Sequence, residues 1–313
     1  MSKKCAVIEH LGAVSQRFLK VLPTFERGIP VLITGIEGAG QSAFAEHLAQ
    51  AYLCMETKNE KPCGECSACR NFEKNLSPDL LTVRPKGKSD WIRMGQIRLT
   101  SEEAEEIPVS EFMRTEPVQA KTKVVLIFEA ERLTREAADG LLRLLEEAPP
   151  YARYILTTSA EGKIIPTIRS RCLRVPCGFE EDEKFSEAAR ALSLGAPESA
   201  LKLDSPELYE WSQSFYSWIR NLRKRSKGEA LVVSEEFLDF CKRYIEANKD
   251  TQSETRASQA EVIQYFSNGL MYLFRTEGIG TGEMLRDLLE MHRALQGNVR
   301  LDYLSAAFFM RNL

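Results

Sequence analysis

The sequence has no long hydrophobic run and no strong excess of charge of one sign. Its 313 residues carry 42 lysines and arginines against 45 aspartates and glutamates, for a formal net charge of −3. Without a strongly basic half, the chain is not expected to grip nucleic acid by itself, so any DNA contact should be shared with partners. No stretch approaches the ~20 apolar residues that cross a bilayer, and Glu9 and His10 interrupt the N-terminal segment. We therefore expect a cytoplasmic protein without membrane contact.

In the cytosol thiols stay reduced, so the eight cysteines favour metal ligation or apolar packing over disulfides. Four of them lie close together in the chain: Cys54, Cys63, Cys66 and Cys69. The C-x-x-C-x-x-C spacing lets successive sulfurs converge on one tetrahedral ion, and Gly64 relaxes the backbone at the turn. Four thiolates leave no open coordination position, so the pattern predicts a structural zinc site in an insertion over 54–69. An iron–sulfur cluster and a metal-free thiol loop are the alternatives.

A glycine-rich loop precedes the cysteines. Residues 35–42 read G-I-E-G-A-G-Q-S, which fits the phosphate-binding pattern G-x-x-x-x-G-K-[ST] except at the lysine. A short β-type run comes before the loop and an amphipathic helical pattern follows it, which is the order that aims a helix N-terminus at phosphate. The residues that would line the degenerate site are Gly35, Gly40, Gln41 and Ser42.

Backbone amides of such a loop can still cradle an anion, but the cation that reaches the outer phosphates is missing at Gln41. We therefore expect the loop to be empty and ATP binding to be weak or absent. The alternative is a glycine-rich turn between a strand and a helix that never bound a nucleotide.

The apolar run over 123–128 predicts another buried strand. In a phosphate-loop ATPase such a strand ends in an aspartate that holds the magnesium shell, and this chain has Phe128 there. Glu129 is the acidic residue beside it. Without the lysine and the aspartate, this carboxylate alone is not expected to activate water for hydrolysis. Farther on, Thr134 predicts the N-cap of an amphipathic helix that ends before Pro149.

The run "ADGLLRLLEEAPPYARYILTT…IIPTIRSRC" resembles AAA+ clamp-loader subunits of bacterial DNA polymerase III, between their acidic strand and the arginine finger in Ser-Arg-Cys. Among them, gamma/tau subunits keep the loop lysine and the strand aspartate. Delta-prime subunits have lost hydrolysis but keep Ser-Arg-Cys. With Gln41, Phe128 and the triplet Ser170-Arg171-Cys172, this chain is similar to the delta-prime type.

The resemblance implies an α/β fold in three parts. It places an AAA+ RecA-like parallel-sheet domain with the zinc-binding insertion over 1–177, a short helical lid over 178–205, and an all-α collar for oligomerisation over 206–313. It also implies a hetero-pentamer with gamma/tau and delta subunits that acts on the sliding clamp and primed DNA. Arg171 would then serve as a catalytic arginine in trans, reaching a neighbour's γ-phosphate.

Other readings stay open at this point. The chain could be an active ATPase of gamma/tau type with unusual loop chemistry, or a zinc-bearing adaptor unrelated to replication. Arg171 could pair only with a carboxylate of its own domain. The acidic stretch over 98–122 is expected to be an exposed excursion, and the basic run over 220–227 a solvated helix end rather than a DNA-binding surface.

Overall fold

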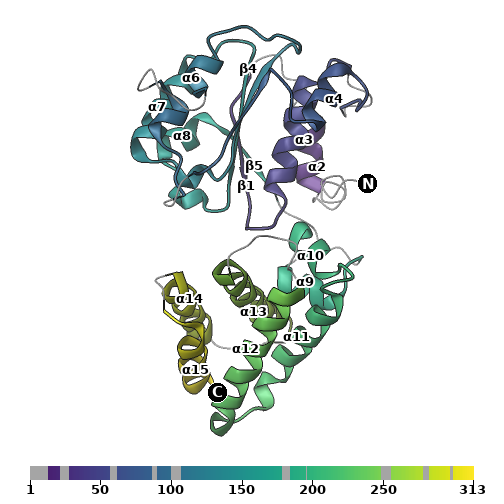
Figure 1. Ribbon diagram of the computed structural model, residues 1–313, viewed down its shortest axis with the longest axis vertical. Coiled ribbons are helices and arrows are strands. Elements are labelled where there is room, and N and C mark those ends of the chain that lie inside the picture. Colours follow the sequence, from purple (N-terminus) through teal and green to yellow (C-terminus); the bar gives the residue numbers. More distant parts are fainter. Residues whose placement is uncertain are drawn as a thin grey trace. The chain divides into compact units, whose positions relative to one another are not determined.

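The computed structural model describes residues 13–21, 28–56, 62–86, 90–99, 107–177, 184–194, 196–247, 255–277, 282–296 and 299–313. The chain divides into two compact units, Met1–Glu180 and Glu181–Leu313. Figure 1 shows a sheet flanked by helices in the first unit and helices alone in the second. Among the helices of the described segments, none has the length and apolar content that a membrane span requires.

The first unit is built on a five-stranded parallel sheet with the order β2-β3-β4-β1-β5. Its strands are β1 (Val31–Thr34), β2 (Leu80–Val83), β3 (Lys123–Ile127), β4 (Ala152–Thr158) and β5 (Leu173–Pro176). Strands that alternate with helical segments along the chain form parallel sheets, because each crossover helix covers a face. The expected α/β class, with a helical C-terminal part, is confirmed.

Helices cover both faces of this sheet and build two separate cores. Along β1, Val31 and Ile33 pack with the helices on one face, whereas Leu32 packs on the other, as the twofold period of a strand requires. One face carries α2 (Ala13–Val21) and α3 (Gln41–Leu53), and α4 (Ser67–Glu73) packs against α3. The other carries α5 (Met94–Ile97), α6 (Val109–Phe112), α7 (Arg135–Glu146) and α8 (Pro166–Arg171) (Figure 1).

The expected helix after Thr134 is α7, whose N-cap hydroxyl accepts a hydrogen bond from the Ala137 amide at 3.3 Å. The sequence predicted an exposed segment over 98–122, and this prediction was wrong for core residues in the second half of the segment. Val109, Phe112 and Met113, which belong to α6 and its C-cap, are buried in the core that this segment shares with α7 and the sheet. The glutamates at 102–106 lie outside the described residues.

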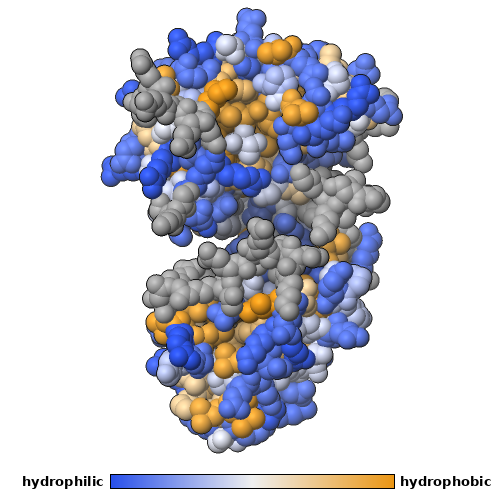
Figure 2. Space-filling view, in the orientation of Figure 1, coloured by the Kyte–Doolittle hydropathy of each residue, from blue (hydrophilic) through white to orange (hydrophobic). Residues whose placement is uncertain are grey.

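The second unit is entirely helical in its described part. Its helices are α9 (Glu187–Ser193), α10 (Pro197–Leu203), α11 (Tyr209–Asn221), α12 (Ala230–Ala247), α13 (Thr255–Glu277), α14 (Gly282–Gln296) and α15 (Leu301–Asn312). Residues of α9 and α10 share one hydrophobic core with α11–α15. Their assignment to a lid and a collar stays a prediction. Figure 2 shows polar residues over much of the visible face of both units.

The basic run over 220–227 lies at the end of α11, and acidic side chains of the same unit partner it. Arg220 donates to Glu277 at 2.8 Å, and Arg225 pairs with Glu236 at 2.9 Å. These pairs support the expected solvated helix end and give no argument for a nucleic-acid surface.

Candidate functional site

The glycine loop connects β1 to α3 at the carboxyl edge of the sheet, where open α/β folds bind ligands. Gly38 and Gly40 adopt left-handed conformations, with φ of 76° and 88°, which side chains other than glycine rarely take. Helix α3 begins at Gln41, and Ser42 is exposed in its first turn. Positive φ values at two glycines between a strand and a helix fit the backbone of a phosphate-binding loop, although position 41 carries glutamine and not lysine.

Gln41 is folded into its own loop. The side chain is buried, at 8% exposure, and its Nε2 donates to the carbonyl oxygen of Ile36 at 2.7 Å. The backbone amide of Ala39 donates to the same oxygen at 3.0 Å. The amide of Gln41 thus closes the loop on itself, where a lysine ammonium would be available to an outer phosphate.

The metal position is altered in a similar way. Phe128 directly follows β3 and is buried, and the guanidinium carbon of Arg84 lies 3.7 Å from the centroid of its ring. The same guanidinium lies 3.6 Å from a carboxylate oxygen of Glu46 on α3. The Phe128 ring offers a divalent ion no ligand oxygen, and the Arg84 cation stacked on it, with Glu46 as its partner, adds no ligand either.

Glu129 is engaged as a counter-ion. Its backbone is left-handed, with φ of 53°, and its carboxylate lies 2.7 Å from Nε of Arg132. Arg132 also pairs with Asp90. Burial raises the pKa of Glu129, Arg132 lowers it, and the neighbouring acids Asp90 and Glu131 raise it further. Glu129, the carboxylate that follows β3, is therefore charge-paired with Arg132, three positions farther along the chain.

Arg171 is the last residue of α8 and lies at the surface, with 41% of its side chain exposed. Its guanidinium pairs with Glu146, itself 48% exposed, and donates to the carbonyl oxygen of Thr167 at 3.2 Å. Ser170 donates to the same carbonyl at 3.0 Å. Exposed ion pairs contribute about 0–1 kcal/mol, so the arginine can be released at little cost.

The four cysteines converge as their spacing predicts. Their sulfurs all lie within 4.8 Å of one another, and those of Cys63 and Cys69 are 3.9 Å apart. A tetrahedral zinc ion with Zn–S bonds of about 2.3 Å sets its sulfurs about 3.8 Å apart, so the cluster fits that geometry. Gly64, with φ of 74°, takes the left-handed turn expected between the ligands.

Backbone amides are aimed at the sulfurs. The amides of Cys63, Cys66 and Cys69 lie 3.3, 3.3 and 3.4 Å from the sulfurs of Cys54, Cys63 and Cys66. For Cys66, burial raises the thiol pKa, but amides of Met55 and Cys69 and neighbouring thiols outweigh it and lower it to about 6. An all-sulfur set with amide donors fits a closed structural metal site.

Sequence reasoning missed Arg84, although a signal was available. Arg84 directly follows β2, and Phe128 directly follows the adjacent strand β3. The carboxyl ends of parallel strands lie at one edge of the sheet. A basic residue directly after β2 is therefore expected to lie beside the residue directly after β3, which here is Phe128.

Comparison with known proteins places these features in a family. The family described as "DNA polymerase III, delta subunit" matches residues 16–178. The delta' subunit of DNA polymerase III from Haemophilus influenzae is 30% identical over 68% of this chain and 68% of its own length. The delta' subunit from Bacillus subtilis is 33% identical over 46% of this chain and 40% of its own length.

Gamma subunits are also similar. That of Buchnera aphidicola from Acyrthosiphon pisum is 31% identical over 49% of this chain and 39% of its own length. The family match covers the loop, the cysteine cluster and Ser170-Arg171-Cys172, and the delta' subunit of Haemophilus influenzae is aligned over a larger share of the chain than this gamma subunit is. The chain therefore belongs to the delta-prime family of DNA polymerase III clamp-loader subunits.

Proposed function

We propose that the chain is a clamp-loader subunit that does not hydrolyse ATP and that supplies Arg171 in trans to a neighbouring ATPase subunit. It works in a hetero-pentamer with gamma/tau and delta subunits in the cytoplasm and helps to load the sliding clamp on primed DNA. Family membership argues against an adaptor unrelated to replication.

The observation that carries the first part is the altered nucleotide site. Gln41 closes the loop through its bond to Ile36, and Arg84 stacks on Phe128 where a metal carboxylate is needed. Hydrolysis by this fold needs the lysine, the metal and a water-positioning carboxylate together. The chain carries Gln41 in place of the lysine and Phe128 in place of the aspartate that would hold the metal, and its remaining carboxylate, Glu129, is paired with Arg132. This combination supports a subunit without turnover of its own.

The second part rests on the placement of Arg171. A planar, permanently charged fork suits the charge that develops on a γ-phosphate, and such fingers contribute about a thousandfold or more in turnover. The weak pair with Glu146 supports this role, because a neighbour's phosphate can compete for an exposed guanidinium.

We also propose that Cys54, Cys63, Cys66 and Cys69 hold one structural zinc ion. The zinc would supply folding energy to the insertion and no chemistry to a nucleotide. Convergence of the four sulfurs within 4.8 Å supports this assignment.

The test is reconstitution with gamma/tau and delta subunits of the same organism. Replacement Arg171→Ala should leave the mass of the assembly unchanged and reduce its DNA-stimulated ATP turnover and clamp loading strongly, by about a hundredfold or more at the adjacent site. Arg171→Lys should rescue little, because an ammonium lacks the fork. Arg114→Ala is the matched control, since among the described residues the ion-pair partner of Arg114 is Glu111, one turn away. Normal turnover in an intact Arg171→Ala assembly would contradict the proposal.

A further inference from the structure

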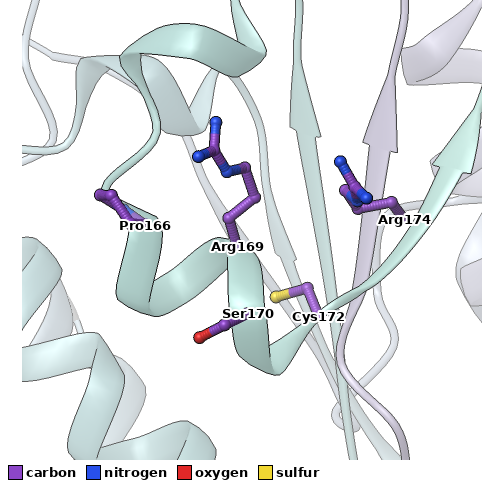
Figure 3. Close-up of a pocket in the computed structure, with 5 residues that line it drawn as sticks. All are labelled: Pro166, Arg169, Ser170, Cys172 and Arg174. Carbon is purple, nitrogen blue, oxygen red and sulfur yellow. The ribbon is translucent and has the colours of Figure 1, made fainter.

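A hollow at the end of α8 has no part in the function proposed above. Its volume is about 620 Å³, within the range of about 300–1,000 Å³ typical of small-molecule sites. It is lined by Pro166, Arg169, Ser170, Cys172 and Arg174. Figure 3 shows the guanidinium groups of Arg169 and Arg174 extending to the same side of the view, whereas the Ser170 oxygen points away from them.

We propose that this hollow binds a phosphate-class oxyanion through Arg169 and Arg174. The two arginines come from different elements, Arg169 from α8 and Arg174 from β5. A tetrahedral phosphate offers three or more acceptor oxygens in different directions and can meet two forks at once. A carboxylate has two coplanar oxygens and is satisfied by one fork, so the arrangement favours the phosphate.

Charge around the hollow favours an anion. Between 161 and 174 the sequence has four cations and one carboxylate, in a chain whose net charge is −3. That carboxylate, Glu161, lies 3.0 Å from one terminal nitrogen of Arg174, whose side chain remains 62% exposed. The guanidinium of Arg169 makes no ion pair or side-chain hydrogen bond with the described part of the chain. Guanidinium N–H groups of Arg169 and Arg174 are therefore available to donate hydrogen bonds to a bound anion.

The remaining lining groups do not oppose an anion. Burial raises the pKa of Cys172 to about 12, so this thiol is neutral and adds no negative charge. The Ser170 hydroxyl donates to Thr167, which stays within the same helix. Pro166 opens α8 and contributes an uncharged wall.

The site is distinct from the finger. Arg171 does not line the hollow, and its guanidinium is held by Glu146 and by the Thr167 carbonyl. Binding at Arg169 and Arg174 can therefore be measured on the isolated chain, and it stands whether or not Arg171 acts in trans.

The experiment titrates the full chain with inorganic tripolyphosphate and follows the arginine side-chain Nε–H signals by NMR. The signals of Arg169 and Arg174 should shift together and saturate at millimolar concentration or below. Arg169→Ala should weaken binding about tenfold or more, since a charge-assisted fork is lost. Arg169→Gln is a second variant of similar length. Arg114→Ala should change the affinity by less than about twofold, because Arg114 does not line the hollow.

Three results would overturn the inference: shifts confined to the amides of Gly38 and Gly40, no saturation by about 10 mM tripolyphosphate, or unchanged affinity in folded Arg169→Ala and Arg169→Gln proteins. A second arm separates two sources of the anion. If the phosphate belongs to a nucleotide on a neighbouring subunit, Arg169→Ala should raise the KM for ATP of the reconstituted complex. If it is free polyphosphate, that KM should stay unchanged while tripolyphosphate binding is lost. Loss of turnover in Arg171→Ala alone reports on the finger and not on this site.

Discussion

At position 41 an amide stands where phosphate-binding loops carry an ammonium group. The Gln41 side chain is long enough to reach back to Ile36, where its buried amide donates a hydrogen bond to the backbone carbonyl oxygen. Arg84 then adds a positive charge beside Phe128, at the end of the strand that should hold a metal. We expect that neither change alone abolishes nucleotide binding, and that together they leave the outer phosphates without a cation and the metal without a carboxylate ligand.

The first prediction concerns rescue of this loop. Gln41→Lys alone should give no measurable ATP turnover, and adding Phe128→Asp should still give weak magnesium-nucleotide binding, because Arg84 would pair with the new carboxylate. Only the further change Arg84→Ala should let Mg-ATP bind at micromolar affinity. Calorimetric titration of the single, double and triple variants checks the order. Turnover in the single variant would show that Arg84 and Phe128 do not matter.

The second prediction concerns the pair that holds Arg171. Glu146→Gln removes the charge partner of an exposed arginine, so the free energy of unfolding should change by less than about 1 kcal/mol. Urea denaturation of the isolated chain measures this, with Glu136→Gln on the exposed side of the same helix as the control. A loss above about 2 kcal/mol would assign the pair a structural role and weaken the case for a released finger.

At the scale of elements, the cysteine cluster lies where α3 ends and α4 begins. Cys54 is the C-cap of α3, and Cys66 is the N-cap of α4, whose Cys69 is buried. The two helix termini thus bring three of the sulfurs into place, and Cys63 lies directly before the left-handed turn at Gly64 that leads to Cys66. A metal bound there ties α4 to α3, which packs directly on the sheet.

The third prediction follows from this arrangement. The purified chain should contain one zinc ion, and Cys66→Ser should lower the zinc content and the melting temperature. Elemental analysis with thermal unfolding provides the measurement. Cys172→Ser is the control, because Cys172 is half-buried in the same unit but lies outside the cluster. Iron, or a well-folded preparation without metal, would contradict the zinc assignment.

Buried polar contacts also hold the segment that precedes β3 against the sheet. Asp79 is fully buried, and its carboxylate accepts hydrogen bonds of 2.7 Å from the backbone amides of Val118, Gln119 and Ala120. Lys123, buried at the start of β3, donates to the carbonyl of Phe112 at 2.8 Å. The segment expected to be an exposed excursion is therefore bound to the sheet by buried polar contacts.

The fourth prediction tests these contacts. Asp79→Asn should cost about 2–3 kcal/mol of unfolding free energy, because the amide keeps one acceptor oxygen and turns a donor toward backbone N–H groups. Asp139→Asn on the exposed surface of α7 is the control and should change stability by less than about 0.5 kcal/mol. Hydrogen exchange should speed up at the amides of Val118–Ala120 in the first variant only. Equal stability of the two variants would rule out a stabilising role for these contacts.

At the scale of the whole molecule, the chain has two units with separate cores. Polar contacts inside the second unit bind α9 to its neighbours. Asn268 donates to the Leu192 carbonyl at 2.8 Å, and Tyr216 donates to Glu187 at 3.0 Å. We therefore expect α9 and α10 to unfold together with α11–α15.

The fifth prediction concerns this division. Calorimetry should resolve two unfolding transitions, one for each unit, and a zinc chelator should lower only the transition of the first unit. Phe237→Ala, in the core of the second unit, should lower only the other transition. A single transition that shifts as a whole in both experiments would mean that the units are coupled.

Some elements could not be found from sequence patterns. Helix α15 falls within the predicted all-α part, but its apolar residues are spread around the helix, so no periodic pattern gives its bounds: Leu301 and Phe308 are buried, whereas Tyr303 and Met310 are 66% and 52% exposed. Such a segment has no amphipathic period to detect, and only the surrounding helices determine which side is covered. The loop over 107–122 was misjudged because its acidic neighbours hid the few residues that enter the core.

The sequence by itself determined the loop without its lysine, the strand that ends in Phe128, the four-cysteine cluster and the Ser-Arg-Cys triplet. Each depends on residues close together in the chain, so spacing and local period reveal it. The tertiary structure alone decided that Arg84 covers Phe128, that Glu146 holds Arg171, and that Arg169 and Arg174 face one hollow. These contacts join different strands and helices, and their distances depend on how crossover helices and parallel strands pack, which no local pattern encodes.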